Sequence, residues 1–151
     1  KLINMKVDIL SSLAVIEHIY DLEDFIAGVR ASKFKYFYYS VPTYGFSVTF
    51  ENVFENIFPR HLSAGHTHLF TENSRKILEE KLGVEPISEW RFGTDIQDLR
   101  RAIEVRLRAK NVSKKYAERV EKELDLVQDK LQEVIDQSHV CSQVHVVCKK
   151  T

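Results

Sequence analysis

The spacing of apolar and polar positions predicts a strand, a helix and a second strand at the start of the chain. Residues 7–13 are rich in branched apolar side chains, as expected for a buried strand. Asp21 offers a helix N-cap, and the residues after it predict a helix over about 21–31. The aromatic run at 35–41 predicts a strand that Pro42 stops. This order is typical of a βαβ unit, so the two strands should be parallel neighbours.

The next segment, residues 43–70, has no clean period. It contains five Phe and three His, together with Gly45, Pro59 and Gly65. A long aromatic connection after a strand is where α/β proteins build a substrate site. We therefore expect an irregular substrate-facing loop here.

Regular structure returns at Thr71, which is a candidate helix cap, and Gly83 marks the end of that helix. A third strand is expected over about 84–92. Thr94 and Gln97 have the spacing of a capping box, in which each side chain satisfies a backbone donor at the start of a helix. That helix should end near residue 109.

The last part of the chain predicts a long helix and a closing strand. Apolar residues recur every three or four positions over 114–137, which indicates an amphipathic helix. The stripe consists of Tyr116, Val120, Leu124, Val127, Leu131 and Ile135. Residues 141–148 then predict a strand. The two helices together form a helical insertion at about 94–138.

Composition narrows the class of protein. With 151 residues, 44% of them hydrophobic, the chain is long enough for a single domain with a real core. Lys plus Arg and Asp plus Glu both number 22, so no net charge attracts nucleic acid or an anionic membrane. No apolar run approaches the roughly 20 residues that span a bilayer, and no signal segment begins the sequence. We expect a cytoplasmic protein that binds neither nucleic acid nor membrane.

Two cysteines, Cys141 and Cys148, fall in the predicted closing strand. Their odd spacing places them on opposite faces of a strand, so they should not form a disulfide with each other. Free thiols fit a reducing compartment.

The first candidate site is Val15-Ile16-Glu17-His18, at the carboxyl end of the first predicted strand. Ligands of open α/β sheets bind at these ends, where helix N-termini and loop backbone groups converge. Glu17 and His18 can therefore line a site. A structural role is the open alternative, with Glu17 capping the turn and His18 packing on it.

Three segments resemble class I S-adenosylmethionine-dependent methyltransferases. The segment Val15-Ile16-Glu17-His18 is similar to the Val-x-Glu-His end of the fourth strand in many small-molecule members. The segment from His66 to Ser74 is similar to the His-x-His-x-Phe-Thr-x-x-Ser stretch after the fifth strand, and residues 142–150 resemble the final antiparallel strand.

The resemblance implies an α/β fold with a Rossmann-like methyltransferase sheet, of which residues 1–151 form the C-terminal half. Parallel strands and a final antiparallel strand are expected, with the two-helix insertion as a departure from the basic fold. It also implies methyl transfer to a small-molecule acceptor such as a hydroxyl of a sugar or natural product. Such insertions resemble the lids or dimer arms of sugar methyltransferases, so a homodimer through the insertion is an expectation.

The resemblance also assigns site residues. Leu13, Ala14, Glu17 and His18 would lie beside the methionine portion of S-adenosylmethionine. His66 and His68 would face the acceptor, and either could be the catalytic base, because histidine exchanges protons near neutral pH. The alternative for both is a local hydrogen-bonding role.

One departure from the family concerns the cofactor loop. The family binds its cofactor through an acidic-Gly-x-Gly loop, but the five glycines of this chain are too dispersed to form one. We expect the cofactor-side half to lie outside this sequence, and the chain alone to bind the cofactor weakly.

Two other functions stay open. His66 and His68, two apart on a strand and with His61 nearby, could bind zinc. No cysteine or carboxylate spacing completes a ligand set, so the sequence predicts no metal site. The second alternative is a non-catalytic interaction module that pairs through the helix at 114–137.

Overall fold

The computed structural model describes residues 6–63 and 65–151. The chain forms two compact units. Of the described residues, the first unit, which we call the sheet unit, comprises 6–43, 65–90 and 143–151. The second, the helical unit, comprises residues 44–63 and 91–142.

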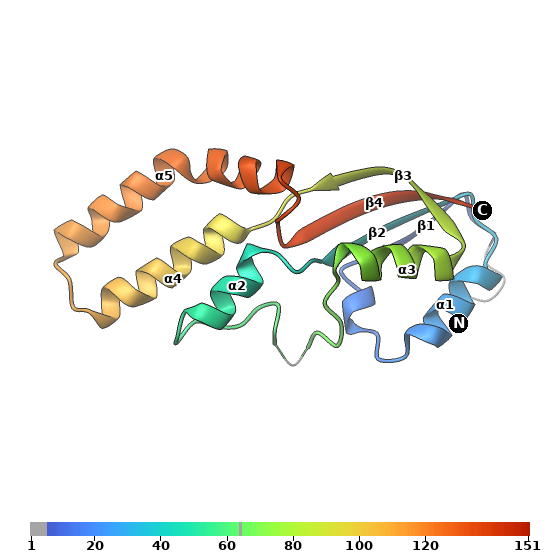
Figure 1. Cartoon of the computed structure of the whole chain (residues 1–151), viewed down its shortest axis with the longest axis horizontal. Helices are drawn as coiled ribbons and strands as arrows, with labels where there is room; N and C mark the ends of the chain where they lie inside the picture. Colours follow the sequence, from blue (N-terminus) through green and yellow to red (C-terminus); the bar gives the residue numbers. More distant parts are fainter. Residues whose placement is uncertain (1–5, 64) are drawn as a thin grey trace. The chain divides into compact units, whose positions relative to one another are not determined.

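A four-stranded sheet with the order β1-β2-β4-β3 organises the sheet unit (Figure 1). Its strands are β1 (Ile9–Leu13), β2 (Tyr36–Pro42), β3 (Val84–Arg91) and β4 (Gln143–Lys150). β1 and β2 are parallel, as the βαβ pattern predicts. β4 is antiparallel to β2 and lies between β2 and β3. The chain therefore has the expected α/β fold class, in which parallel strands are joined by a final antiparallel one.

Local capping signals position the two helices of the sheet unit. α1 (Leu22–Ala31) begins at Asp21, whose side chain accepts a hydrogen bond from the backbone of Asp24. α3 (Glu72–Leu82) begins at Thr71, which forms a capping box with Ser74. It ends at Gly83, whose φ of 69° lies in the left-handed region that favours glycine.

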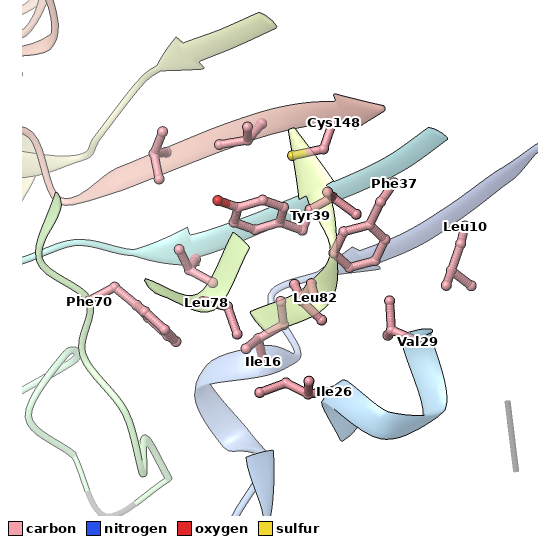
Figure 2. Close-up of a cluster of buried hydrophobic side chains, with 14 of the residues drawn as sticks. Leu10, Ile16, Ile26, Val29, Phe37, Tyr39, Phe70, Leu78, Leu82 and Cys148 are labelled. Carbon is pink, nitrogen blue, oxygen red and sulfur yellow. The ribbon is translucent and has the colours of Figure 1, made fainter. Parts of the chain in front are cut away.

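One face of the sheet packs against α1 and α3 (Figure 2). Phe37 and Tyr39 of β2 and Cys148 of β4 point towards the helices, where Leu78 and Leu82 are buried. These strand residues alternate with residues on the other face, as the twofold strand period requires. The opposite face is less covered: Ile9 and Trp90 are among its exposed residues.

Three helices make up the helical unit: α2 (Phe46–Val53), α4 (Asp95–Ala109) and α5 (Lys114–Gln137). The latter two lie where the sequence predicts helices. Ser113 caps α5 by accepting a hydrogen bond from the backbone of Tyr116. Within α5, all of whose residues the structure describes, no residue is buried.

The carboxylate of Asp95 is the centre of the helical unit. It is fully buried and accepts hydrogen bonds from the backbone N–H groups of Ser47 (2.8 Å) and Ser142 (3.0 Å). The Ser47 hydroxyl and the Gln132 amide donate to it as well. One side chain therefore joins the start of α2, the start of α4, the last turns of α5 and the segment before β4.

Gly45 is required where α2 begins. A Cβ at this position would lie 2.4 Å from the carbonyl carbon of Cys141, closer than any side chain can approach. The close passage of these two backbones explains why α2 starts at a glycine without a side-chain cap.

Four predictions about local structure are wrong. Residues 43–70 are not wholly irregular, because α2 lies within them. Thr94 forms no capping box, because its hydroxyl accepts a hydrogen bond from Arg60 instead (2.5 Å). Cys141 lies before β4 rather than within it, although both cysteines are buried and neither forms a disulfide. Pro42 is the last residue of β2, so the strand ends one residue later than predicted.

We expect Asp95→Asn to destabilise the protein by about 2–4 kcal/mol, because the amide turns one buried acceptor into a donor that faces other donors. Urea unfolding followed by circular dichroism measures this change. The matched control is Asp129→Asn on the exposed side of α5, which should change the free energy of unfolding by less than about 0.5 kcal/mol. Equal effects of the two substitutions would show that Asp95 does not hold the unit together.

Candidate functional site

A sharp turn follows β1 at Ala14. Its φ of 50° lies in the left-handed region, which costs a non-glycine residue roughly 1 kcal/mol. The N–H of Ala14 donates to the hydroxyl of Ser40 (3.0 Å), so the turn is tied to β2. The chain then enters a short 3-10 helix, η1 (Ile16–His18), which carries Glu17 and His18.

The loop at residues 65–68 is attached to this 3-10 helix through the backbone carbonyl of Glu17. That oxygen accepts hydrogen bonds from the backbone N–H groups of Thr67 (2.8 Å) and His68 (3.2 Å). The Thr67 hydroxyl lies 3.0 Å from the same oxygen and 3.2 Å from the carbonyl of Ile19. Two segments about 50 residues apart in sequence are therefore fixed side by side.

Glu17, His18 and His66 come together at this junction, and we call them the Glu-His-His cluster. One ligand atom from each residue lies within 4.8 Å of the others. The two imidazole rings meet edge to face, with centroids 4.8 Å apart. Glu17 is only 4% exposed, whereas His18 is exposed and His66 is half-buried.

His68 has different surroundings from His66. Its Nδ1 hydrogen-bonds to the Thr67 hydroxyl (2.9 Å), and its ring stacks on Phe70. It lines a cleft of about 210 Å³ together with Leu22 and Ile26 of α1 and Leu78 of α3. The two histidines do not lie in a strand, so their spacing does not give them a shared face.

His61 belongs to another arrangement, in the helical unit. It is buried, and its Nδ1 lies 2.8 Å from the carboxylate of Glu51. The same carboxylate accepts hydrogen bonds from the backbone N–H groups of His61 and Leu62. Burial opposes ionisation of Glu51, but these hydrogen bonds lower its pKa overall. His61 therefore fixes a loop within the helical unit.

Two further buried groups in the sheet unit have a structural role. The Tyr39 hydroxyl donates to Glu79 (2.5 Å), which also accepts from Arg75. Burial, together with that hydrogen bond, raises the pKa of Tyr39 far above its usual range. Burial also raises the pKa of the Cys148 thiol to about 12, so that thiol is not an activated nucleophile at neutral pH.

A third polar group lies on the other face of the sheet. The Tyr38 hydroxyl is 2.8 Å from Nδ1 of His145, and the ring of Trp90 stacks on His145. Burial lowers the pKa of His145, which favours the neutral imidazole at neutral pH. We interpret this group as packing of the sheet face.

The predicted cofactor residues lie at the carboxyl end of β1, as expected from their positions. Leu13 is 43% exposed and Ala14 is exposed, so both offer apolar surface there. Glu17 is buried, whereas His18 is exposed at the surface. No contact with a cofactor tests these assignments, and they stay predictions.

Sequence reasoning missed Ser40, Gly65 and Thr67, which hold the site in place. Ser40 ties the Ala14 turn to β2, and the Gly65 carbonyl lies 2.6 Å from Nδ1 of His18. The only sequence signal for Thr67 was its place between two candidate histidines. Nothing local indicated that its partner is Glu17.

No family model matches this chain, and no curated protein does. Among solved structures, a putative sarcosine dimethylglycine methyltransferase from Galdieria sulphuraria is similar, with a TM-score of 0.46 and 9% sequence identity. The match covers 95% of this chain and 53% of that one, so this chain spans about half its length. A likeness this weak assigns no function.

None of the helices in the part of the chain that the structure describes combines the length and apolarity needed to cross a bilayer.

We expect Thr67→Val to loosen the loop, because valine removes the hydroxyl bonded to the carbonyls of Glu17 and Ile19. Amide hydrogen exchange of residues 67 and 68 should accelerate by about tenfold, the equivalent of one hydrogen bond. Thr67→Ser keeps the hydroxyl and should leave the exchange rates near those of the unaltered protein. Identical rates in both variants would contradict this role of the hydroxyl.

Proposed function

We propose that this chain contributes the acceptor side of an S-adenosylmethionine-dependent methyltransferase that acts on a hydroxyl group of a small molecule, such as a sugar or natural product. The observation that carries the proposal is the convergence of three segments at the carboxyl end of β1: the Ala14 turn, η1 and the loop at 65–68. Carboxyl ends of strands are where open α/β sheets bind ligands.

The topology of the sheet supports the same proposal. The sequence resemblance implies a final antiparallel strand in the C-terminal half of a methyltransferase sheet, and β4 is antiparallel to β2. The segments that carry the resemblance, at 15–18 and 66–74, meet in space through the carbonyl of Glu17. Two of the three segments that carry the resemblance therefore lie side by side, which supports the proposal.

The residues present fit only part of the cofactor. Leu13 and Ala14 offer exposed apolar surface suited to the methionine portion. The five dispersed glycines provide no loop for the nucleotide portion, so we expect weak binding by this chain. When bound, the cofactor supplies an electrophilic methyl group. The protein must then position the acceptor oxygen and help remove its proton.

His66 is our candidate for the proton acceptor. It lies beside His18 and Glu17, and imidazoles exchange protons near neutral pH. His68 is the second candidate, but its ring lies against Phe70 in the cleft between α1 and α3. We therefore assign the base to His66 before His68.

The alternative, an interaction module that pairs through α5, has less support. Part of the apolar stripe of α5 is exposed, including Tyr116 and Leu131. Within the helical unit, however, α4 and α5 are joined by polar contacts such as Arg100 with Asp125 (2.5 Å). A homodimer through these helices stays a prediction.

S-adenosylhomocysteine should shift the backbone amide resonances of residues 13, 14, 17 and 18 when added at millimolar concentration to the isotope-labelled chain. The reason is that these residues form the ligand-binding end of β1, even though weak affinity is expected. Amides of the distal part of α5 provide the internal control and should not move. If residues 13–18 are as unresponsive as α5, the assignment of the cofactor site is wrong.

In the full-length protein, we expect His66→Asn to lower kcat by about 10²–10⁴, the range for loss of a general base. His68→Asn should cause the smaller loss, because its ring lies away from the Glu-His-His cluster. Steady-state kinetics with a hydroxyl acceptor measures both. A larger loss in the His68 variant would reverse the assignment.

A further inference from the structure

We propose that Glu17, His18 and His66 bind a divalent transition-metal ion such as Zn²⁺, with coordination positions left open for a ligand. The proposal concerns an ion that the sequence did not predict. The zinc set considered from the sequence consisted of His66 and His68 with His61 nearby. The fold instead brings Glu17 and His18 to His66 from about 50 residues away in the sequence.

The donor set suits such an ion. Two imidazoles and one carboxylate are typical protein ligands of catalytic Zn²⁺, which keeps a further position open. The same set also binds other first-row metals, including non-haem Fe²⁺. Mg²⁺ and Ca²⁺ prefer sites made entirely of oxygen atoms, so they fit this cluster poorly.

The geometry requires only a small contraction. Ligand atoms of the three residues lie within 4.8 Å of one another. Zn²⁺ binds nitrogen and oxygen at about 2.0–2.2 Å, which places neighbouring ligand atoms roughly 3–3.5 Å apart. Movements of about 1 Å would close the cluster around an ion. The His18 side chain is exposed and can make such a movement without disturbing the core.

The carboxylate of Glu17 is an independent indication of a bound cation. Its Oε2 is buried and has no hydrogen-bond partner among the described residues, although Glu17 is only 4% exposed. Burying a carboxylate oxygen without a partner costs several kcal/mol unless a cation or donor compensates it. A metal ion held jointly with His18 and His66 supplies that compensation.

The surroundings of His18 prepare it as a ligand. Its Nδ1 lies 2.6 Å from the backbone carbonyl of Gly65, and a carbonyl can only accept. Nδ1 therefore carries the proton, and the lone pair of the neutral ring is on Nε2. A hydrogen bond from the second ring nitrogen to a carbonyl is the usual support of a metal-binding histidine, because it fixes both tautomer and orientation.

The loop at 65–68 supplies both this support and the third ligand. Gly65 holds His18, and His66 follows immediately in the chain. The backbone bonds of Thr67 and His68 to the Glu17 carbonyl then fix the loop beside η1. The same peptide segment thus presents one ligand and orients another.

A bound ion would also change the assignment of roles, and this step rests on the proposed function. An acceptor hydroxyl at an open coordination position would be acidified by the metal. His66 would then act as a ligand, and the ion would take over activation of the hydroxyl. The metal site itself does not depend on methyl transfer, because it can be measured without cofactor or acceptor.

The experiment is calorimetric titration of Zn²⁺ into the chain after treatment with a chelator. We expect one ion per chain. Glu17→Gln and His66→Asn should each weaken binding by at least about tenfold, because each removes a ligand. His68→Asn is the matched control, since it removes a neighbouring imidazole outside the cluster, and its affinity should equal that of the unaltered chain. Co²⁺ provides a second probe through its visible absorption, which should be lost in the two ligand variants.

Failure to bind Zn²⁺ stoichiometrically would overturn the site, as would unchanged affinity in both ligand variants. His18→Asn covers the case in which the Glu17 and His66 variants do not fold, because the His18 side chain is exposed. This variant too must weaken Zn²⁺ binding for the site to stand. Turnover that is insensitive to chelator, in a chain that binds Zn²⁺ through these residues, would overturn only the role in hydroxyl activation. Shifts caused by S-adenosylhomocysteine test the proposed function separately.

Discussion

The candidate site depends on one backbone oxygen, the carbonyl of Glu17. It accepts the N–H groups of Thr67 and His68 and thereby joins the end of β1 to a loop that follows in sequence much later. With the backbone of residue 17 committed to the loop, its side chain turns to the histidines, where Oε2 is left buried without a partner among the described residues. The attachment of the loop and the unpartnered carboxylate oxygen at the cluster therefore come from the same residue.

The sequence predicted those parts of the fold that local interactions determine. Asp21 and Thr71 each cap the helix that they were expected to cap, and Gly83 ends α3 in the left-handed conformation. Such signals act within one turn of a helix, so they can be recognised without knowledge of the rest of the chain. The parallel pairing of β1 and β2 also followed, because a helix between two strands allows few connections.

The errors arose where a distant partner replaced a local one. α2 has no side-chain cap, and the N–H of Ser47 in its first turn is satisfied by Asp95, 48 residues away. Its aromatic residues gave one overlooked signal: Phe46, Phe50 and Phe54 are spaced by four, and their rings contact in succession. The same explanation applies to Thr94, whose hydroxyl accepts from Arg60 and is not available for a capping box. The site followed this pattern too, since the candidate residues were recognised but their grouping required contacts across the chain.

The absence of buried residues along α5 has a consequence for how the chain can vary. Polar contacts fix one end of this helix near the Asp95 carboxylate, where Gln132 bonds to Asp95 and to the N–H of Ile96, and Asp136 accepts from the N–H of Gly93. Further along α5, Asp125 pairs with Arg100 of α4. Beyond them, no core position selects for a particular length or register. Insertions or deletions of whole turns at the end of α5 away from Asp95 would be nearly neutral for folding. Related chains could therefore differ in the length of the paired helices α4 and α5, while the end near Asp95 stays the same.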